Sequence, residues 1–377
     1  MVQAPGDSGA QRVMGLMSGT SLDGVDAAII ETDGETIQGF GPALLRPFTD
    51  QERACLIAAT ETAVAAGRAG APLPNLAEAA RVVTTAHLDA ARALLARPDA
   101  GRIELIGLHG QTVLHRPERG LSVQLGDAGA LADALGVPVV ADLRQADLGA
   151  GGQGAPLVPV YHAALADHLA LAPPLVFLNL GGVANLTWIG PDGALIAFDT
   201  GPANGLIDLL VQARGAGRYD ADGRIAAAGQ VDPAALAALM AAPYFAKPLP
   251  KSLDRYDFSL DPVLPLTTED AAATLVAFTA DAVAEAARLL PAPPQRWIVC
   301  GGGRHNPALM AALAARLPGV VACDALGLRG DFIEAEAFAF LARRARKGLP
   351  ITFPGTTGVA RPLSGGRCWV PRLENAA

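Results

Sequence analysis

The sequence predicts an α/β protein that folds as two lobes. Its 377 residues exceed the roughly 250–300 at which a single hydrophobic core stops growing, so two domains are expected. Apolar, β-rich runs alternate with alanine-rich helical patterns, as in sheets covered by helices. This alternation recurs on both sides of a stretch at 172–174 that contains two prolines. We therefore expect one lobe from residues 1–170 with 345–377, and a second from 171–344.

The elements can be assigned in chain order. Short apolar runs bounded by glycine or polar residues predict strands, and they span residues 13–16, 26–31, 104–108, 137–142, 175–179, 195–199 and 296–300. Longer runs rich in alanine and leucine predict helices, and they span residues 77–95, 126–135, 157–169, 204–212, 233–242, 268–290, 307–316 and 331–347. Strands and helices therefore succeed one another in both halves of the chain.

The composition argues against a membrane protein and a nucleic-acid-binding protein. The longest uncharged run, residues 169–191, contains prolines, glycines and asparagines, which a membrane-spanning helix would avoid. The net charge is −8, which gives no positive field to attract a polyanion. We therefore expect neither a membrane segment nor a nucleic-acid partner.

The N-terminus and the cysteines predict a cytoplasmic protein. Residues 1–12 have neither the basic start nor the apolar centre of a secretion signal. The four cysteines, Cys55, Cys300, Cys323 and Cys368, are far apart and form no C-x-x-C pair. Such spacing indicates neither a zinc site nor a disulfide framework, and a reducing cytoplasm is the simplest location.

The first glycine-rich segment, residues 15–26, lies between two apolar runs and predicts a hairpin turn. Glycines let the backbone approach a ligand closely, while hydroxyl and carboxylate groups suit a phosphate and its Mg²⁺. The alternative is an ordinary hairpin, because turns favour the same residue types. The candidate ligand-binding residues of this segment are Gly19, Thr20, Ser21, Asp23, Gly24 and Asp26.

Two further strand ends are rich in glycine. Residues 179–187 predict a strand, a turn at Gly181 and Gly182, and a second strand, so that two hairpins could clamp a phosphate chain. Residues 299–307 predict a strand that ends in three glycines before a helix, and this flat surface suits an adenine or a ribose; the glycines are Gly301, Gly302 and Gly303. In both places the glycines could instead relieve crowding at a strand end.

Two polar segments are candidates for the substrate side. Residues 107–112 follow a predicted strand as a loop and carry His109 and Gln111, and residues 142–147 carry Arg144 and run into a glycine-rich stretch. Loops after strands are where α/β proteins place ligands. A lone histidine is more often structural, and the spacing of His109 and His115 does not suit a metal pair.

Asp199 is the strongest single candidate for an acid–base group. It ends a predicted strand, a Gly-Pro turn follows it, and a helix begins near Gly205, so its carboxylate should project from the sheet edge. A carboxylate in that place can take a proton from a hydroxyl group or from water. The alternative role is capping the following helix. The same alternative applies to Asp331, Glu334 and Glu336.

A dinucleotide-binding site is not favoured. Residues 149–154 match G-x-G-x-x-G, but Pro156 and Pro159 stand where the phosphate-binding helix should begin. No acid ends a strand about 20 residues later, as that motif requires. A Walker loop with its lysine is also absent from the sequence.

The glycine-rich segments and Asp199 together resemble the superfamily of sugar kinases, heat-shock proteins and actin. Whole segments are more closely similar to the anhydro-N-acetylmuramic acid kinase family, and the similarity extends from about residue 13 to about residue 358. The matching segments are residues 15–26, 107–112, 151–159, 179–186, 198–204, 250–252 and 300–307.

This resemblance implies two actin-like (ribonuclease H-like) lobes with a nucleotide- and substrate-binding cleft between them. It implies that ATP, Mg²⁺ and water convert 1,6-anhydro-N-acetylmuramic acid to N-acetylmuramic acid 6-phosphate, in peptidoglycan recycling. Asp199 would activate the water, Asp23 would hold Mg²⁺ directly or through water, and the glycine turns with Asn185 would hold the nucleotide. A homodimer is expected from the family.

The resemblance also indicates the substrate side, with the candidates His109, Gln111, Arg144 and Glu334. Arg144 could bind the lactyl carboxylate through its guanidinium fork. Ala203 stands where the family usually has a second glycine, and Gln145 and Ala146 stand where it has further arginines. These departures leave substrate strictness open. The alternatives are a nucleotide-binding sensor or a kinase for another anhydrosugar on the same fold.

Overall fold

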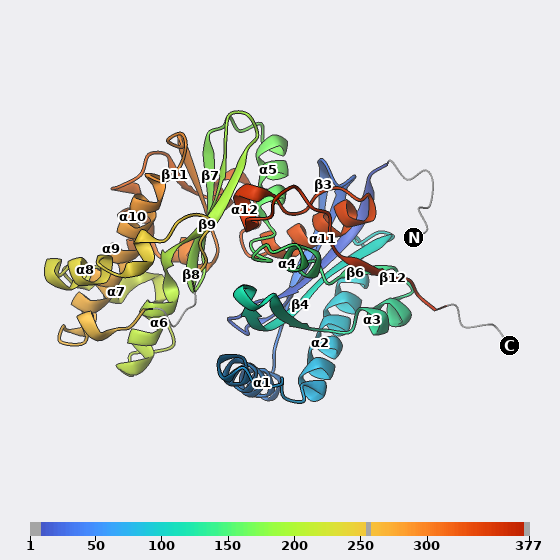
Figure 1. Cartoon of the computed structure of the whole chain (residues 1–377), viewed down its shortest axis with the longest axis horizontal. Helices are drawn as coiled ribbons and strands as arrows, with labels where there is room; N and C mark the ends of the chain where they lie inside the picture. Colours follow the sequence, from blue (N-terminus) through green and yellow to red (C-terminus); the bar gives the residue numbers. More distant parts are fainter. Residues whose placement is uncertain (1–8, 254–257, 373–377) are drawn as a thin grey trace. The chain divides into compact units, whose positions relative to one another are not determined.

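The computed structural model describes residues 9–253 and 258–372, which divide into two compact units (Figure 1). Unit 1 contains the described residues up to Ala170 and those from Phe332 onward, and unit 2 contains Leu171–Asp331. The sequence analysis placed the return of the chain to the first lobe at residue 345, and the structure places it at 332. The reason is helix α11 (Ile333–Arg346), which packs on strands of unit 1.

Unit 1 is built on a seven-stranded sheet. Its strands are β1 (Gln11–Ser18), β2 (Gly24–Thr32), β3 (Ile37–Pro47), β4 (Leu105–Arg116), β5 (Leu121–Leu125), β6 (Val139–Ala141) and β12 (Arg367–Trp369). The order is β12-β6-β4-β1-β2-β3, and β5 pairs with β4. Because β1 runs parallel to β4, Ser18 at the start of the first glycine turn lies opposite Gln111.

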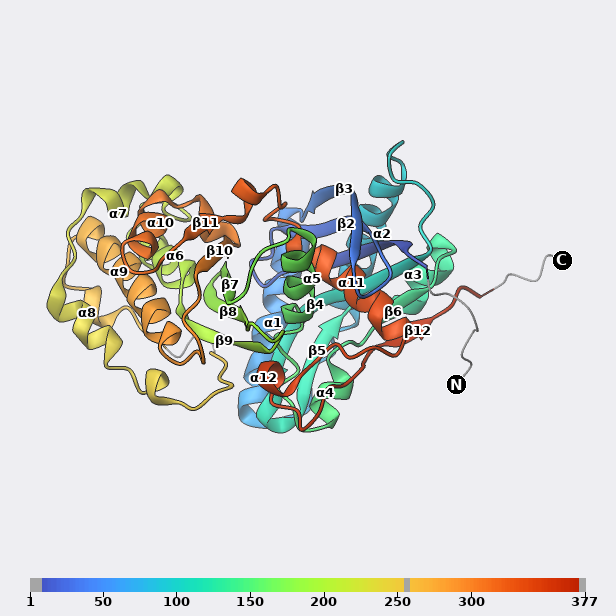
Figure 2. The ribbon, with the colours of Figure 1, turned by 90° about the horizontal axis from the view of Figure 1, so that it is seen from above.

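Helices cover both faces of this sheet (Figure 2). On one face α2 (Ala77–Leu95) and α3 (Ala128–Leu135) bury Leu94 and Leu131 against Leu16 of β1. On the other face α11 contacts β1, β2 and β4. A Cβ atom on Gly15 or Gly107 would collide with the α11 backbone, so glycine permits this close approach. The other helices of unit 1 are α1 (Asp50–Ala69), α4 (Gln145–Gly149), α5 (Pro159–His168) and α12 (Pro354–Thr357).

Unit 2 is built on a five-stranded sheet in the order β11-β10-β7-β8-β9. Its strands are β7 (Leu175–Leu180), β8 (Val183–Ile189), β9 (Leu195–Pro202), β10 (Arg296–Cys300) and β11 (Val320–Ala322). In the antiparallel ladders Asn179 faces Asn185, and Asn185 faces Asp199. Because cross-strand partners point to the same face of a sheet, these residues form a polar row beside the β7–β8 turn.

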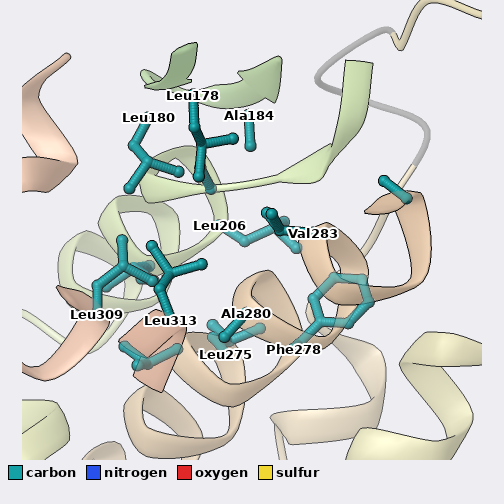
Figure 3. Packing of buried hydrophobic residues seen from close by; sticks show 14 of the residues in the cluster. Leu178, Leu180, Ala184, Leu206, Leu275, Phe278, Ala280, Val283, Leu309 and Leu313 are labelled. Atoms are coloured by element: carbon teal, nitrogen blue, oxygen red, sulfur yellow. The ribbon is translucent and has the colours of Figure 1, made fainter. Parts of the chain in front are cut away.

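One face of this sheet packs against helices (Figure 3). Leu178 and Leu180 of β7 meet Leu206, Leu275 and Leu309, which come from three different helices. Burying each of these side chains contributes about 2 kcal/mol. The helices of unit 2 are α6 (Asn204–Ala213), α7 (Arg224–Ala228), α8 (Pro233–Met240), α9 (Thr268–Ala287) and α10 (Pro307–Ala314).

The observed elements confirm the predicted α/β class. Every predicted strand and helix overlaps an observed element, and α2 has the predicted bounds. The prediction of a loop at residues 107–112 is wrong, because β4 continues to Arg116 and pairs with β5. None of the helices in the described ranges is long and apolar enough to cross a membrane.

Candidate active site

Asp199 lies within β9, three residues before the strand ends at Pro202. The prediction that it ends the strand is therefore wrong, because Gly201 and Pro202 still pair with Ala184 and Val183 of β8. The helix-cap alternative is also excluded. Helix α6 begins after Ala203, and no side chain caps it.

Three residues from a single segment bind Asp199. Its N–H donates to the carbonyl of Lys251 at 3.0 Å, and its carbonyl accepts from the Tyr244 hydroxyl at 2.6 Å. Its carboxylate Oδ2 accepts from the N–H of Leu253 at 2.7 Å. No other hydrogen bond to this carboxylate is found within residues 9–253 and 258–372.

The surroundings of Asp199 raise the pKa of its carboxyl group. Burial raises the pKa of Asp199 to about 7, although the Leu253 N–H acts in the opposite direction. A general base is most effective when its pKa lies near the working pH. The polar row therefore contains a titrating carboxylate opposite the neutral amide of Asn185.

The β7–β8 turn is held by the start of α6. The N–H groups of Ala203 and Gly205 donate to the carbonyl of Gly182 at 3.0 and 3.1 Å, and that of Asn204 donates to Gly181 at 3.0 Å. A Cβ atom on Gly181 would have its nearest heavy atom at 3.6 Å, and one on Gly182 at 4.0 Å. Packing therefore does not require glycine at either position, which favours a ligand that approaches the backbone.

Ala203 does not need to be glycine on account of a positive φ. Its φ is −127°, outside the left-handed region that favours glycine. Its side chain is buried in the core of unit 2 beside Leu206. The departure from the family pattern at this position therefore leaves the turn intact.

The three glycines after β10 have different reasons to be glycine. Gly301 has a φ of 74°, which other residues rarely adopt. A Cβ atom on Gly303 would lie 2.6 Å from Cβ of Leu180, whereas a Cβ atom on Gly302 would meet nothing within 4 Å. Gly302 is therefore the open position of this turn, and the other two serve the fold.

Arg304 stabilises the glycine turn after β10. Its buried guanidinium donates to the carbonyl of Gly301 at 3.0 Å and forms ion pairs with Asp324 at 2.7 Å and Asp331 at 2.8 Å. Hydrogen bonds from Arg304 lower the pKa of both carboxyls. Asp331 therefore has a structural partner.

The first glycine turn joins β1 to β2. Thr20, Ser21 and Asp23 are exposed there, and a Cβ atom on Gly19 would find its nearest neighbour at 3.6 Å. Gly24, by contrast, packs against the backbone of Arg46, so its glycine is a requirement of the sheet. No group of three or more His, Cys, Asp or Glu side chains that could hold a metal is found in the described ranges. A cation at Asp23 would take its other ligands from water and phosphate, as Mg²⁺ commonly does.

Gln111 supports this turn from β4. Its Nε2 donates to the carbonyl of Gly19 at 3.2 Å, and the Ser18 hydroxyl donates to the carbonyl of Gly110 at 3.2 Å. The Gln111 side chain is buried, and its Oε1 has no hydrogen-bond partner among the described residues. In this geometry Gln111 ties β4 to the glycine turn.

His109, Arg144 and Glu334 form a second cluster in unit 1. One Arg144 nitrogen donates to the carbonyl of Gly154 at 2.7 Å, and another lies 2.9 Å from Nε2 of His109. His109 Nδ1 lies 2.9 Å from the carbonyl of Gly110, so Nδ1 carries the proton and Nε2 accepts. Burial and the neighbouring Arg144 lower the pKa of His109, which keeps this ring neutral.

Arg144 and Glu334 of this cluster carry charges of opposite sign. Burial lowers the pKa of Arg144 to about 10, while Glu334 and Asp147 counteract the shift. Burial raises the pKa of Glu334, and Arg144 counteracts that shift. The Arg144 cation and the Glu334 carboxyl therefore stabilise each other's charged form at a buried position. A polar ligand that binds there could contact both groups.

The sequence analysis missed the residues that hold these groups. Tyr244 gave no signal, and Lys251 was noted only within a family-like segment. Asp147 was noted only in passing, yet its buried carboxylate accepts from the Gly154 N–H and from the Thr357 hydroxyl, both at 2.6 Å. Asp147 thereby supports the loop whose carbonyl binds Arg144.

Glycine turns and a buried carboxylate suit phosphoryl transfer to a small molecule, because that reaction depends mainly on positioning and charge neutralisation. The family model for anhydro-N-acetylmuramic acid kinase matches residues 11–370 of this chain. The chain therefore belongs to the anhydro-N-acetylmuramic acid kinase family, and it is a kinase. The predicted α/β class is confirmed, and the chain divides into two compact units as predicted.

Curated relatives agree with this match over nearly the whole chain. The anhydro-N-acetylmuramic acid kinase of Phenylobacterium zucineum is 58% identical over 369 residues, which cover 96% of this chain and 100% of the relative. The corresponding protein of Caulobacter vibrioides is 56% identical, with 94% and 98% covered. That of Rhodospirillum rubrum is 53% identical, with 96% and 95% covered.

Proposed function

We propose that this chain uses ATP to open 1,6-anhydro-N-acetylmuramic acid with water and to phosphorylate O6, giving N-acetylmuramic acid 6-phosphate and ADP. The observation that carries the proposal is the Asp199 carboxylate, which has a pKa of about 7 and lies in the polar row beside the open β7–β8 turn. The names of the relatives support the sugar. A role in peptidoglycan recycling would follow from that substrate.

The proposed chemistry uses Asp199 as the general base. Its carboxylate takes a proton from water, the water oxygen bonds to the anomeric carbon, and the bond from that carbon to O6 breaks. The released O6 then bonds to the γ-phosphorus of ATP, and the bond from that phosphorus to the bridging oxygen breaks, so that ADP leaves. A positioned base is needed because water is a poor nucleophile until it loses a proton. Opening an internal bridge delivers O6 without a separate binding step.

The glycine turns fit the phosphates of ATP. Gly19, Gly181 and Gly182 all leave space where a Cβ would point, so backbone N–H groups near them can approach a phosphate chain. The exposed carboxylate of Asp23 is the hard oxygen donor that Mg²⁺ prefers. Bound Mg²⁺ would neutralise the charge that develops in phosphoryl transfer. Gly302 offers the open surface for adenosine.

On the substrate side we assign binding to Arg144, His109 and Glu334. They are brought together in unit 1, and Arg144 supplies the positive charge that the lactyl carboxylate of the sugar requires. Gln111 acts indirectly on this proposal, by holding the first glycine turn. The homodimer and the cytoplasmic location stay predictions.

A product assay tests this function. Purified protein with ATP, Mg²⁺ and 1,6-anhydro-N-acetylmuramic acid should release ADP and a phosphosugar in equal amounts, and mass spectrometry should show the mass of the sugar plus water and a phosphoryl group. Reactions without sugar or without Mg²⁺ are the controls. ATP binding without phosphosugar would support the sensor alternative. Turnover of a different anhydrosugar, but not of 1,6-anhydro-N-acetylmuramic acid, would support the alternative of a kinase for another anhydrosugar.

Substitutions of the adjacent Gly302 and Gly303 should distinguish an effect on ligand binding from an effect on stability. Gly302→Ala should leave the free energy of unfolding within about 0.5 kcal/mol, because the new methyl meets nothing, and it should weaken ATP binding. Gly303→Ala should lower the free energy of unfolding by about 1–3 kcal/mol, because its methyl would overlap Leu180. Thermal unfolding and ATP titration of both variants measure the two effects. Unchanged ATP affinity in Gly302→Ala would remove this turn from the nucleotide site.

A further inference from the structure

We propose that Tyr244 is a positioning residue for Asp199, and that residues 244–253 form an anchoring segment that holds the base in place. This inference rests on the proposed function, because it assumes that Asp199 is the base. The anchoring segment begins in a 3₁₀ helix, Pro243–Ala246, and ends at Leu253.

The sheet alone does not hold Asp199. Strand β9 is the outer strand of its sheet, so one side of its backbone has no neighbouring strand. The β8–β9 ladder is also irregular beside Asp199, because its register shifts between Ala184 and Asn185. The N–H and carbonyl of Asp199 bind Lys251 and Tyr244 of the anchoring segment. The anchoring segment therefore replaces the missing strand at this position.

Tyr244 is itself held firmly. Its side chain is 4% exposed, and its ring contacts those of Phe245 and Phe258 at centroid distances of 5.8 and 6.0 Å. The Lys251 ammonium lies 4.8 Å from the centre of the Tyr244 ring and 3.3 Å from the carbonyl of Phe245. An aromatic ring packed in this way keeps its hydroxyl in one direction. The bond to the Asp199 carbonyl is therefore a rigid contact.

The anchoring segment also distinguishes the two carboxylate oxygens. Oδ2 accepts the Leu253 N–H at 2.7 Å, and Oδ1 has no hydrogen-bond partner among the described residues. We therefore assign Oδ1 as the atom that takes the proton from water. A hydrogen bond to a carboxylate favours its charged form, so displacement of Asp199 from Leu253 would raise its pKa.

Among the residues that the structure describes, the other ionisable groups of the anchoring segment are Tyr244, Lys247 and Lys251. Across the strand pair, Asn185 is neutral. Glu285 on α9 interacts electrostatically with Lys251. Burial lowers the pKa of Lys251. Burial raises the pKa of Asp199 to about 7, so an acid limb near that pH is assigned to Asp199.

The test is Tyr244→Phe, which removes the hydroxyl and keeps the ring. We expect kcat to fall about 10-fold, as for the loss of one hydrogen bond, while the KM values for ATP and for the sugar stay within about twofold. The midpoint of the acid limb of kcat/KM should move to higher pH. Tyr161→Phe is the matched control, because it removes another buried hydroxyl, one that donates to Glu336 at 2.8 Å. It should change thermal stability without moving the pH midpoint.

Lys251→Met is the second variant and should act in the same direction as Tyr244→Phe, because it loosens the Tyr244 ring. If Tyr244→Phe and Lys251→Met lower only the melting temperature, and leave kcat and the pH midpoint at wild-type values, the positioning role is wrong. Failure of the proposed function looks different: in that case Asp199→Asn retains activity, or no phosphosugar forms with the wild-type protein.

Discussion

Asp199→Asn is expected to lower kcat at least about 10³-fold, within the range that general bases contribute, while ATP binding is retained. The amide has the shape of the carboxylate and can still accept the Leu253 N–H, so the fold should be preserved. It cannot take a proton from water at neutral pH. Steady-state kinetics with the anhydrosugar, together with ATP titration by calorimetry, measure both parts of this result.

The pH profile adds an independent reading of the same group. Because burial raises the pKa of Asp199 to about 7, kcat/KM of the wild-type protein should fall about tenfold per pH unit below that value, as the base becomes protonated. The residual activity of Asp199→Asn should lack this acid limb. Asp192→Asn is the matched control, since it changes an exposed acid of the same unit. An unchanged limb in Asp199→Asn would assign the titration to another group.

Arg144→Met is expected to weaken the apparent affinity for the anhydrosugar, seen as a rise in its KM of about 10- to 100-fold, which corresponds to the loss of a charged hydrogen bond. The KM for ATP should change little. Methionine retains much of the side-chain volume and removes the positive charge beside His109 and Glu334. Arg144→Lys keeps the charge without the planar fork, and it should show a smaller defect. Steady-state kinetics with each substrate varied in turn measure these effects.

A substrate that lacks the lactyl carboxylate distinguishes a role of Arg144 in substrate recognition from a structural role. Arg144 also binds the carbonyl of Gly154, so its loss could disturb the loop rather than the ligand. With an anhydro amino sugar that lacks the lactyl group, wild type and Arg144→Met should have similar kcat/KM values if the guanidinium recognises the carboxylate. Equal losses with both sugars would show that Arg144 has a structural role only.

The sequence predicted those elements whose signals are local. Helix α2 was found with its observed bounds because its apolar positions recur at helical spacing. Helix α1 was missed, although Thr49 and Glu52 form a capping box and Gly70 ends the helix. Only three of its residues, Leu56, Ala63 and Gly67, are buried. The apolar periodicity of α1 is therefore weak. The capping box and Gly70 alone were not enough to predict the helix.

Candidate site residues were predicted for the same reason. Glycine turns after strands and a carboxylate near a strand end are patterns within a few residues, so Gly182, Gly302 and Asp199 could be found from the chain alone. The structural role of each of these residues could not be predicted from the sequence. Gly302 and Gly303 are equivalent in the sequence, yet only Gly303 is crowded by Leu180, which lies far earlier in the chain.

By itself, the sequence determined the α/β class, the glycine turns and the candidate base, because backbone freedom, periodicity and residue chemistry are local properties. Only the tertiary structure decided that Gln111 holds the Gly19 carbonyl, that Arg144 lies against His109, and that the anchoring segment binds Asp199. Hydrogen bonding and desolvation depend on which distant segments meet. For that reason the raised pKa of the Asp199 carboxyl follows from the fold.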